Sequence, residues 1–430
     1  MEAVPLKQEL KKQHTYEEAI EATSVGRFNY FLLGICGLCY MAGGVEVGGH
    51  SVLILSAECD LNLSLHDKGL IVAVGFFGYI LSLPVLGYSS DTFGRVRTIK
   101  TTLISSVCMS LLSSFSVNKT MLIVTRFLTC VLISATQSSV FTLITEFNSN
   151  KTRLRHLTIL AAFVFAGTFY FREKEFYPCQ EIKEEEGQEK VKLESLFDRI
   201  LDMGKQTVQL FKLKRLLKTA HLNFIALNTA VIGGGVAMWM PSILTDVMGS
   251  DSNVKTVCGS VMLRATRTIN VTEVADVDVE CSDDLNILPF VVMTCVSICM
   301  FVISLATSTI VNLIGRNGLI VMWLTFSTIS CFAVYASDLY IVNILSVTLI
   351  INAVTINGNL YGVASEIYPT SINSMGVSLV IMMTSIGCLL GSYLVGPLVL
   401  YYCYQTFLVF GCLLVLVIVL VTLLPNNKRS

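Results

Sequence analysis

Two charged residues, Glu46 and Arg126, lie inside long apolar runs of this sequence. Glu46 falls in the segment 41–50, and Arg126 lies near the start of the run 121–145. A charged side chain within a lipid bilayer is costly, so such residues usually mark a path or a site for ions and polar solutes. Glu46 is therefore a candidate to hold a cation or a proton. The alternatives are a protonated carboxyl group, or one that faces an external vestibule near His50, and for Arg126 a side chain that snorkels to the interface.

A second group of polar residues lies where the chain leaves one apolar run and enters the next. The stretch 87–97 supplies two glycines, one carboxylate and two guanidinium groups. A carboxylate that faces guanidinium groups at a helix end can latch that end and release it, and Gly87 and Gly94 allow close passage and a turn. The alternative is a cationic anchor at the membrane surface without a gating role.

Trp239 is a third candidate, because Gly233–Gly235 and Pro241 make its helix easy to break and an aromatic ring there can contact a solute. Anchoring at the membrane interface is an equally ordinary role for this tryptophan. The five histidines are dispersed, and the sequence has neither a glycine-rich phosphate loop nor a His-Glu-x-x-His motif. We therefore expect no enzyme, no cofactor and no metal site.

The composition requires these residues to be positioned by membrane helices. Of 430 residues, 53% are hydrophobic and 14% are charged, and the net charge is −1. Soluble domains carry about 25% charged residues. We expect an all-α polytopic membrane protein whose partner is the lipid bilayer and which binds no nucleic acid. Apolar runs long enough to span, about 20 residues, occur at 28–55, 69–88, 98–117, 121–145, 221–244, 287–311, 318–336, 339–364, 375–398 and 402–424.

The run Leu157–Phe171 is shorter, and we favour an arrangement in which it does not cross the bilayer. The predicted organisation is a cytoplasmic tail (1–26), an N-terminal helical bundle (27–171), a charged cytoplasmic linker (172–220), a C-terminal bundle of six helices (221–424) with an extramembrane loop (246–286), and a tail (425–430). The loop has the alternating pattern of a small β-rich subdomain.

Cationic residues cluster in the N-terminal tail and after the second and fourth runs, which predicts a cytoplasmic N-terminus. The sequons at Asn62, Asn118 and Asn270 then fall on the other side, where glycosylation takes place. Cys258 and Cys281 bracket a segment that a disulfide could close there, with Cys59 as a competing thiol. Most other cysteines, Cys403 among them, lie in apolar runs and are interpreted as small hydrophobic residues.

Several motifs point to one family. Residues 87–97 match the signature Gly-x-x-x-Asp-x-x-Gly-Arg-x-Arg, residues 365–370 include Glu-x-Tyr-Pro-Thr, residues 312–317 repeat the first signature weakly, and residues 56–69 look like a first external loop. With these motifs the chain resembles the major facilitator superfamily, and within it the synaptic vesicle glycoprotein 2 and organic ion transporter-like group.

The resemblance implies two bundles of six helices around a midplane site and rocking-type alternating access. About one and a half helices of the first bundle are missing from that plan. It also implies that Arg126 couples to protons or anions, and that Glu146 and Glu366 pair with Arg95 and Arg316. The gating or latch candidates are Gly87, Asp91, Gly94, Arg95, Arg97, Glu146, Arg316 and Glu366.

The implied function is secondary transport of a small organic solute that can carry charge, with a coupling proton or cation as a further candidate partner. The implied location is the plasma membrane or a vesicle membrane. The alternative is a membrane protein of the vesicle-glycoprotein type that does not transport, or a truncated relative without activity.

Overall fold

The computed structural model describes residues 26–57, 61, 65–170, 213–248, 256–261, 288–337, 339–368 and 373–423. These residues are almost entirely helical, and no strand occurs among them. Seven of their helices are long and apolar enough to cross a membrane. The protein is therefore an all-α, multi-pass membrane protein, as the composition predicts, and the described parts of all ten long apolar runs are helical.

The first bundle consists of α2 (Arg27–Ala57), α3 (Leu65–Phe93), α4 (Arg95–Ser114), α5 (Lys119–Phe147) and α6 (Asn150–Tyr170). Buried hydroxyl groups join α5 to its neighbours: Ser82 to Ser134 and Ser90 to Ser139, each at 2.7 Å, and Thr102 to Thr136 at 3.3 Å. Small hydroxyl residues at helix contacts allow close approach and hydrogen bonding within lipid.

The second bundle consists of α8 (Leu213–Thr229), the π-helix η1 (Ala230–Gly234), α9 (Gly235–Met248), α11 (Leu288–Ala336), α12 (Tyr340–Ile350), α13 (Asn352–Ile367) and α14 (Asn373–Thr422). The α11 and α14 helices each contain a break, at Gly315 and Tyr402. Gly387 and Gly391 of α14 pack directly on the backbone of Leu227 and Val231. Close packing of this small-residue pair is what its spacing predicts.

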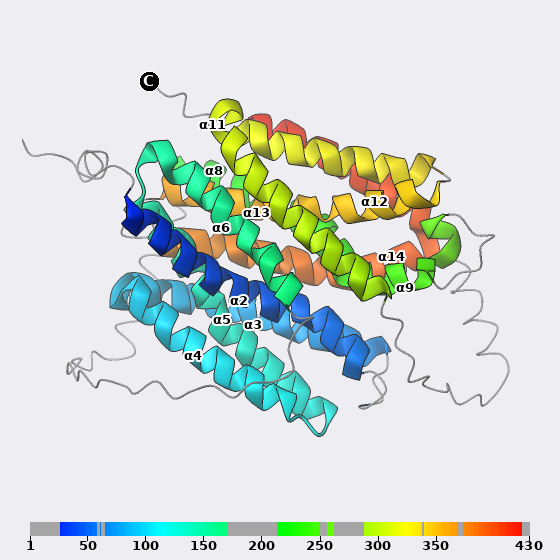
Figure 1. Cartoon of the computed structure of the whole chain (residues 1–430), viewed down its shortest axis with the longest axis horizontal. Coiled ribbons are helices and arrows are strands. Elements are labelled where there is room, and N and C mark those ends of the chain that lie inside the picture. Colours follow the sequence, from blue (N-terminus) through cyan, green and yellow to red (C-terminus); the bar gives the residue numbers. More distant parts are fainter. Residues whose placement is uncertain are drawn as a thin grey trace, which may run out of the picture.

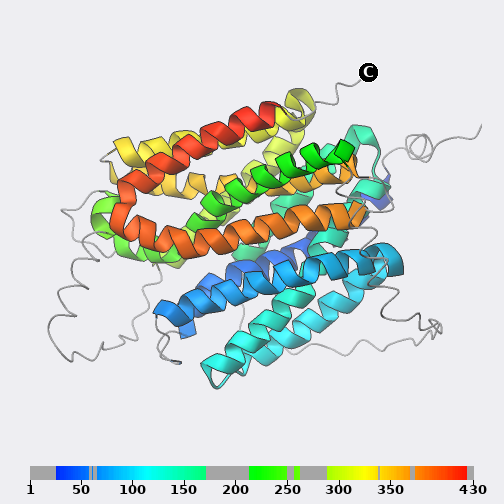
Figure 2. The same ribbon diagram turned by 180° about the vertical axis from the view of Figure 1, so that it is seen from behind.

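The two bundles lie side by side (Figure 1). The α3 helix packs against α14, and α6 packs against α11, so each bundle contributes two helices to the boundary (Figure 2). We call the end of the molecule that holds Asp91 the Asp91 face. It also holds the first turns of α2 and α6, because Asn29 Nδ2 donates to the carbonyl oxygen of Phe147 at 2.8 Å.

The run Leu157–Phe171 belongs to a helix that is longer than the apolar run itself. All of it except Phe171, which lies outside the described residues, belongs to α6, a helix of 21 residues and thus about 31 Å long. The α6 helix runs parallel to α2, since Phe163 packs on Gly37 and Val164 packs on Gly44. The helix extends beyond the apolar run because its first turns are polar, with His156 and Thr158 buried against neighbouring helices. The α6 helix is not among the seven that are long and apolar enough to cross a membrane, so the arrangement in which this run does not cross stays a prediction.

The α8 helix begins at Leu213, before the predicted bundle boundary at 221. Its Thr219 accepts a hydrogen bond from the Tyr368 hydroxyl at 2.9 Å, which places this end at the Asp91 face. The parallel course of α2 and α6 takes Tyr170 toward the opposite face. The interior of the predicted linker and most of the loop 246–286 lie outside the described residues, apart from a helical turn at 257–261.

Candidate functional site

A chain of polar contacts joins four helices at the Asp91 face. Arg95 Nη2 lies 3.3 Å from Asp91 Oδ1 and 2.6 Å from Glu146 Oε1. The second oxygen of Asp91 accepts a hydrogen bond of 3.1 Å from the backbone N–H of Met375. The Asp91 side chain is 5% exposed. Because Met375 lies in the first turn of α14, the carboxylate connects the first bundle to the positive end of a helix in the second.

Two glycines give this contact its geometry. Gly94 has φ +92, which favours glycine, and it allows α4 to begin directly after α3 so that Arg95 turns back toward Asp91. A Cβ atom at Gly87 would meet the Ser378 side chain, so glycine lets α3 approach α14 closely. Arg97 is exposed and points to a different environment from that of Arg95.

The second bundle repeats part of this arrangement. Gly315 has φ +77 and precedes Arg316, as Gly94 precedes Arg95. The side chain of Glu366 lies outside the described residues, so its pairing with Arg316 stays a prediction. The weak motif at 312–317 thus has the same backbone turn as the strong one at 87–97.

The two charged residues predicted within the membrane form an ion pair. Arg126 Nη1 donates to Glu46 Oε2 at 3.0 Å, and the two side chains are 9% and 14% exposed. The pair joins α5 to α2 in the first bundle. A buried charge needs such a partner, because an isolated charge in a low-dielectric interior is strongly unfavourable.

Tyr79 of α3 relates this pair to aromatic residues of both bundles, because it interacts electrostatically with Glu46, Tyr40 and Tyr361. The rings of Tyr40 and Phe141 meet edge to face with centroids 5.1 Å apart, and those of Phe141 and Tyr361 do so at 5.2 Å. Because Tyr361 belongs to α13, this group of aromatic residues spans the boundary between the bundles.

Tyr79 and Gln137 belong to this neighbourhood, and neither was predicted from the sequence. The side chain of Gln137 fills the space that a Cβ atom on Gly43 would need. Gln137 follows Arg126 by eleven residues, about three helical turns, and therefore lies on the same face of α5. A tyrosine and a glutamine in apolar runs carry no charge signal, and only the helical period could have placed Gln137 beside Arg126.

Trp239 has a packing role in the structure. Its indole N–H donates to the carbonyl oxygen of Ser392 at 2.8 Å. Its ring lies on Gly396 of α14, where a Cβ atom would clash with it. These contacts hold α9 against α14 within the second bundle, and a role for Trp239 in solute binding stays a prediction.

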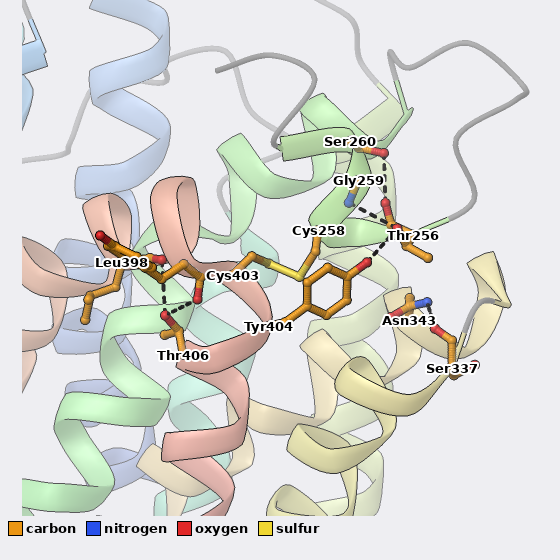
Figure 3. Close-up of a disulfide and its surroundings, with 11 residues drawn as sticks. Thr256, Cys258, Gly259, Ser260, Ser337, Asn343, Leu398, Cys403, Tyr404 and Thr406 are labelled. Carbon is orange, nitrogen blue, oxygen red and sulfur yellow. Dashed lines mark hydrogen bonds between the residues drawn. A yellow bond between two sulfur atoms is a disulfide. The ribbon is translucent and has the colours of Figure 1, made fainter. Parts of the chain in front are cut away.

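The predicted disulfide between Cys258 and Cys281 is wrong in its second partner. Cys258 pairs with Cys403, 145 residues away, with the Cα atoms 5.5 Å apart (Figure 3). The break of α14 at Tyr402 brings Cys403 against the buried turn 257–261. Cys281 lies outside the described residues. Sequence analysis interpreted Cys403 as a small hydrophobic residue, because its apolar run conceals the corner at which the helix bends.

Of the three sequons, the structure describes only Asn118, because Asn62 and Asn270 lie outside the described residues. Asn118 is exposed, and its side-chain oxygen accepts a hydrogen bond of 2.8 Å from the backbone N–H of Met121. It therefore caps the first turn of α5. This turn lies at the end of α4 that is remote from Arg95, so Asn118 is on the face opposite Asp91.

Comparison with known proteins agrees with this architecture. The family model of the Major Facilitator Superfamily matches residues 35–171. Synaptic vesicle glycoprotein 2B of Homo sapiens is 32% identical over 165 residues, which are 38% of this chain and 24% of that protein. The niacin transporter NiaP of Acinetobacter baylyi is 28% identical over 144 residues, which are 34% of this chain and 33% of the transporter. The aligned segments thus span a third or less of these relatives.

A solved structure extends the similarity to the whole fold. The human organic anion transporter MFSD10 (TETRAN) superposes with a TM-score of 0.60 over 95% of this chain and 100% of that one, at 11% identity. This likeness concerns the fold alone. The sequence matches and the motif at 87–97 thus make residues 35–171 similar to the major facilitator superfamily and to synaptic vesicle glycoprotein 2, and the solved structure extends the likeness of fold to nearly the whole chain.

Proposed function

We propose that this protein is a secondary carrier of a small organic solute, and that the Glu46–Arg126 pair forms its binding or coupling site. The observation that carries the proposal is the burial of this ion pair between α2 and α5. Charged side chains within a membrane carry a large free-energy cost and are therefore usually kept for function. Rocking of the bundles would open the site to each face in turn.

The contact between Asp91 and Met375 supports this mechanism, because it crosses the boundary between the bundles at one face only. In the proposed cycle the contact holds the Asp91 face closed, and its release lets α3 move away from α14. Arg95 and Glu146 keep the Asp91 carboxylate oriented toward α14. A coupling proton or cation would act by changing the charge of Glu46.

We further propose that the Asp91 face is cytoplasmic and that the protein resides in the plasma membrane or a vesicle membrane. Arg27, Arg95, Arg97 and Lys100 gather at this face, as the positive-inside rule requires. The disulfide Cys258–Cys403 supports the same orientation, because it lies at the break of α14, about 30 residues beyond the first turn that contacts Asp91, and disulfides persist in oxidising compartments.

A second candidate function is that of a membrane protein that does not transport. The course of α6 and the start of α8 favour it, since only five helices of the first bundle occur among the described residues. A first bundle of five helices could bind partners without completing a transport cycle.

Uptake into proteoliposomes distinguishes these functions. The full chain is reconstituted and tested with a panel of organic anions, cations and neutral solutes. The carrier predicts saturable uptake of at least one solute, with strong loss in Glu46→Gln and Asp91→Ala and unchanged uptake in Lys100→Gln, an exposed residue of α4. Folded protein without saturable uptake of any solute would support the second function.

A further inference from the structure

Two buried hydrogen-bond donors beside the ion pair have no partner among the described residues. Arg126 donates to Glu46 through Nη1, whereas its Nε is unpartnered. The hydroxyl group of Tyr79 is unpartnered as well. The two residues are 8% and 3% exposed. Buried polar atoms nearly always have a partner, so two such atoms in one cluster indicate a missing acceptor.

The charge of the cluster decides what kind of acceptor fits. Arg126 brings a permanent positive charge, and Glu46 compensates it through one guanidinium nitrogen. A cationic solute would meet the like charge of Arg126 in a buried environment, where such repulsion is strong. An anionic group could accept hydrogen bonds from Arg126 Nε and from Tyr79, and it would compete with Glu46 for the guanidinium group.

The surroundings of the cluster indicate what the rest of the solute looks like. Tyr40 and Tyr361 interact electrostatically with Tyr79, and the rings of both contact Phe141 edge to face. Flat aromatic rings pack well against edge-to-face arrangements of this kind. The site therefore combines two hydrogen-bond donors that lack a partner among the described residues with a group of aromatic side chains.

We propose that, if the protein is the carrier proposed above, its solute is a small aromatic monoanion such as a ring carboxylate. The anionic group accepts hydrogen bonds from Arg126 Nε and the Tyr79 hydroxyl, and the ring lies against Tyr40 and Tyr361. Tyr79 is then a specificity-determining residue, because its hydroxyl donates a hydrogen bond to the anionic group, and a cationic solute lacks this acceptor.

Benzoate, benzamide and benzamidine test this assignment, because they share one shape and differ in charge. Binding to the purified full chain is measured by the rise in the thermal unfolding midpoint, a readout independent of transport. Benzoate should bind with the highest affinity. Tyr79→Phe should weaken benzoate about fivefold to tenfold by removing one hydrogen bond. It should leave benzamidine unchanged, and Tyr335→Phe, a distant exposed tyrosine, should change neither.

Arg126→Lys is the second variant, because it keeps the positive charge and removes the Nε donor. Benzoate affinity should fall at least tenfold in this variant. The inference is overturned if none of the three probes binds, if benzamidine binds as tightly as benzoate, or if neither variant weakens benzoate. Selective benzoate binding without uptake would refute the carrier and leave the anion site intact. Uptake restricted to cations would refute the anion site and leave the carrier intact.

Discussion

Asp91 accepts a hydrogen bond from the backbone N–H of Met375, a residue 284 positions further along the chain, at 3.1 Å. The bond joins the last turn of α3 to the first turn of α14 and so connects the two bundles at one face. Backbone N–H groups at a helix start have no partner within the helix, which makes them suited to a carboxylate. The contact therefore stabilises closure of the Asp91 face without requiring a specific side chain from α14.

Substitution of Asp91 should weaken that closure. In Asp91→Ala the Met375 N–H loses its acceptor and Arg95 keeps only Glu146, so we expect a loss of about 1.5–3 kcal/mol. Asp91→Asn keeps an acceptor oxygen and should lose less. The thermal unfolding midpoint of the purified variants measures the effect. Equal midpoints for wild type and Asp91→Ala would show that the contact contributes nothing to stability.

Gly94 should tolerate no side chain, whatever space surrounds it. Its φ of +92 disfavours L-residues, so Gly94→Ala should lower the free energy of unfolding by about 1–2 kcal/mol. Gly69→Ala is the matched control, because Gly69 also has open space around it but lacks a positive φ. Gly315→Ala should behave like Gly94→Ala. If all three variants unfold at the same temperature, the turn is not strained by alanine.

The ion pair of Glu46 and Arg126 should be more sensitive to loss of one partner than of both. Removal of one member leaves a buried uncompensated charge, which typically costs about 3–5 kcal/mol. Arg126→Met should therefore destabilise the protein more than Glu46→Gln combined with Arg126→Met. Thermal unfolding of the single and double variants provides this comparison. A double variant that loses the sum of the two single effects would indicate that the residues do not interact.

The disulfide predicts a specific chemical linkage. Mass spectrometry of peptides from the unreduced protein should find one that joins Cys258 to Cys403. Loss of the bond should cost about 2–5 kcal/mol. Cys258→Ser, Cys403→Ser and the double variant should be equally destabilised, while Cys281→Ser should retain the linked peptide. A peptide that joins Cys258 to Cys281 would contradict the structure.

Asn118 reports the orientation of the protein. If the face opposite Asp91 is luminal or extracellular, Asn118→Gln should remove one glycan in cells, visible as a faster band on a gel. Asn150→Gln serves as the control, because its sequon lies at the start of α6 on the Asp91 face. A shift in Asn150→Gln instead would invert the orientation.

The sequence predicts much of this molecule for clear physical reasons. The length and hydropathy of the apolar runs predict the membrane helices. The charged residues Glu46 and Arg126 can be recognised because they interrupt such runs. The length of α6 could not be predicted from its apolar run, since its polar first turns are buried against neighbouring helices. Pairing Cys258 with Cys403 requires knowledge of the break at Tyr402. Tyr79 and Gln137 became candidates only when the packing of α2, α3 and α5 was known.

Exchange across the proteoliposome membrane tests the central claim most directly. A carrier that alternates between two faces moves external labelled solute faster when the vesicles are preloaded with the same unlabelled solute. We predict such stimulation by internal benzoate, its loss in Glu46→Gln, and its persistence in Lys100→Gln. Uptake that is identical with empty and preloaded vesicles, in protein with the Cys258–Cys403 bond intact, would contradict alternating access at the Glu46–Arg126 site.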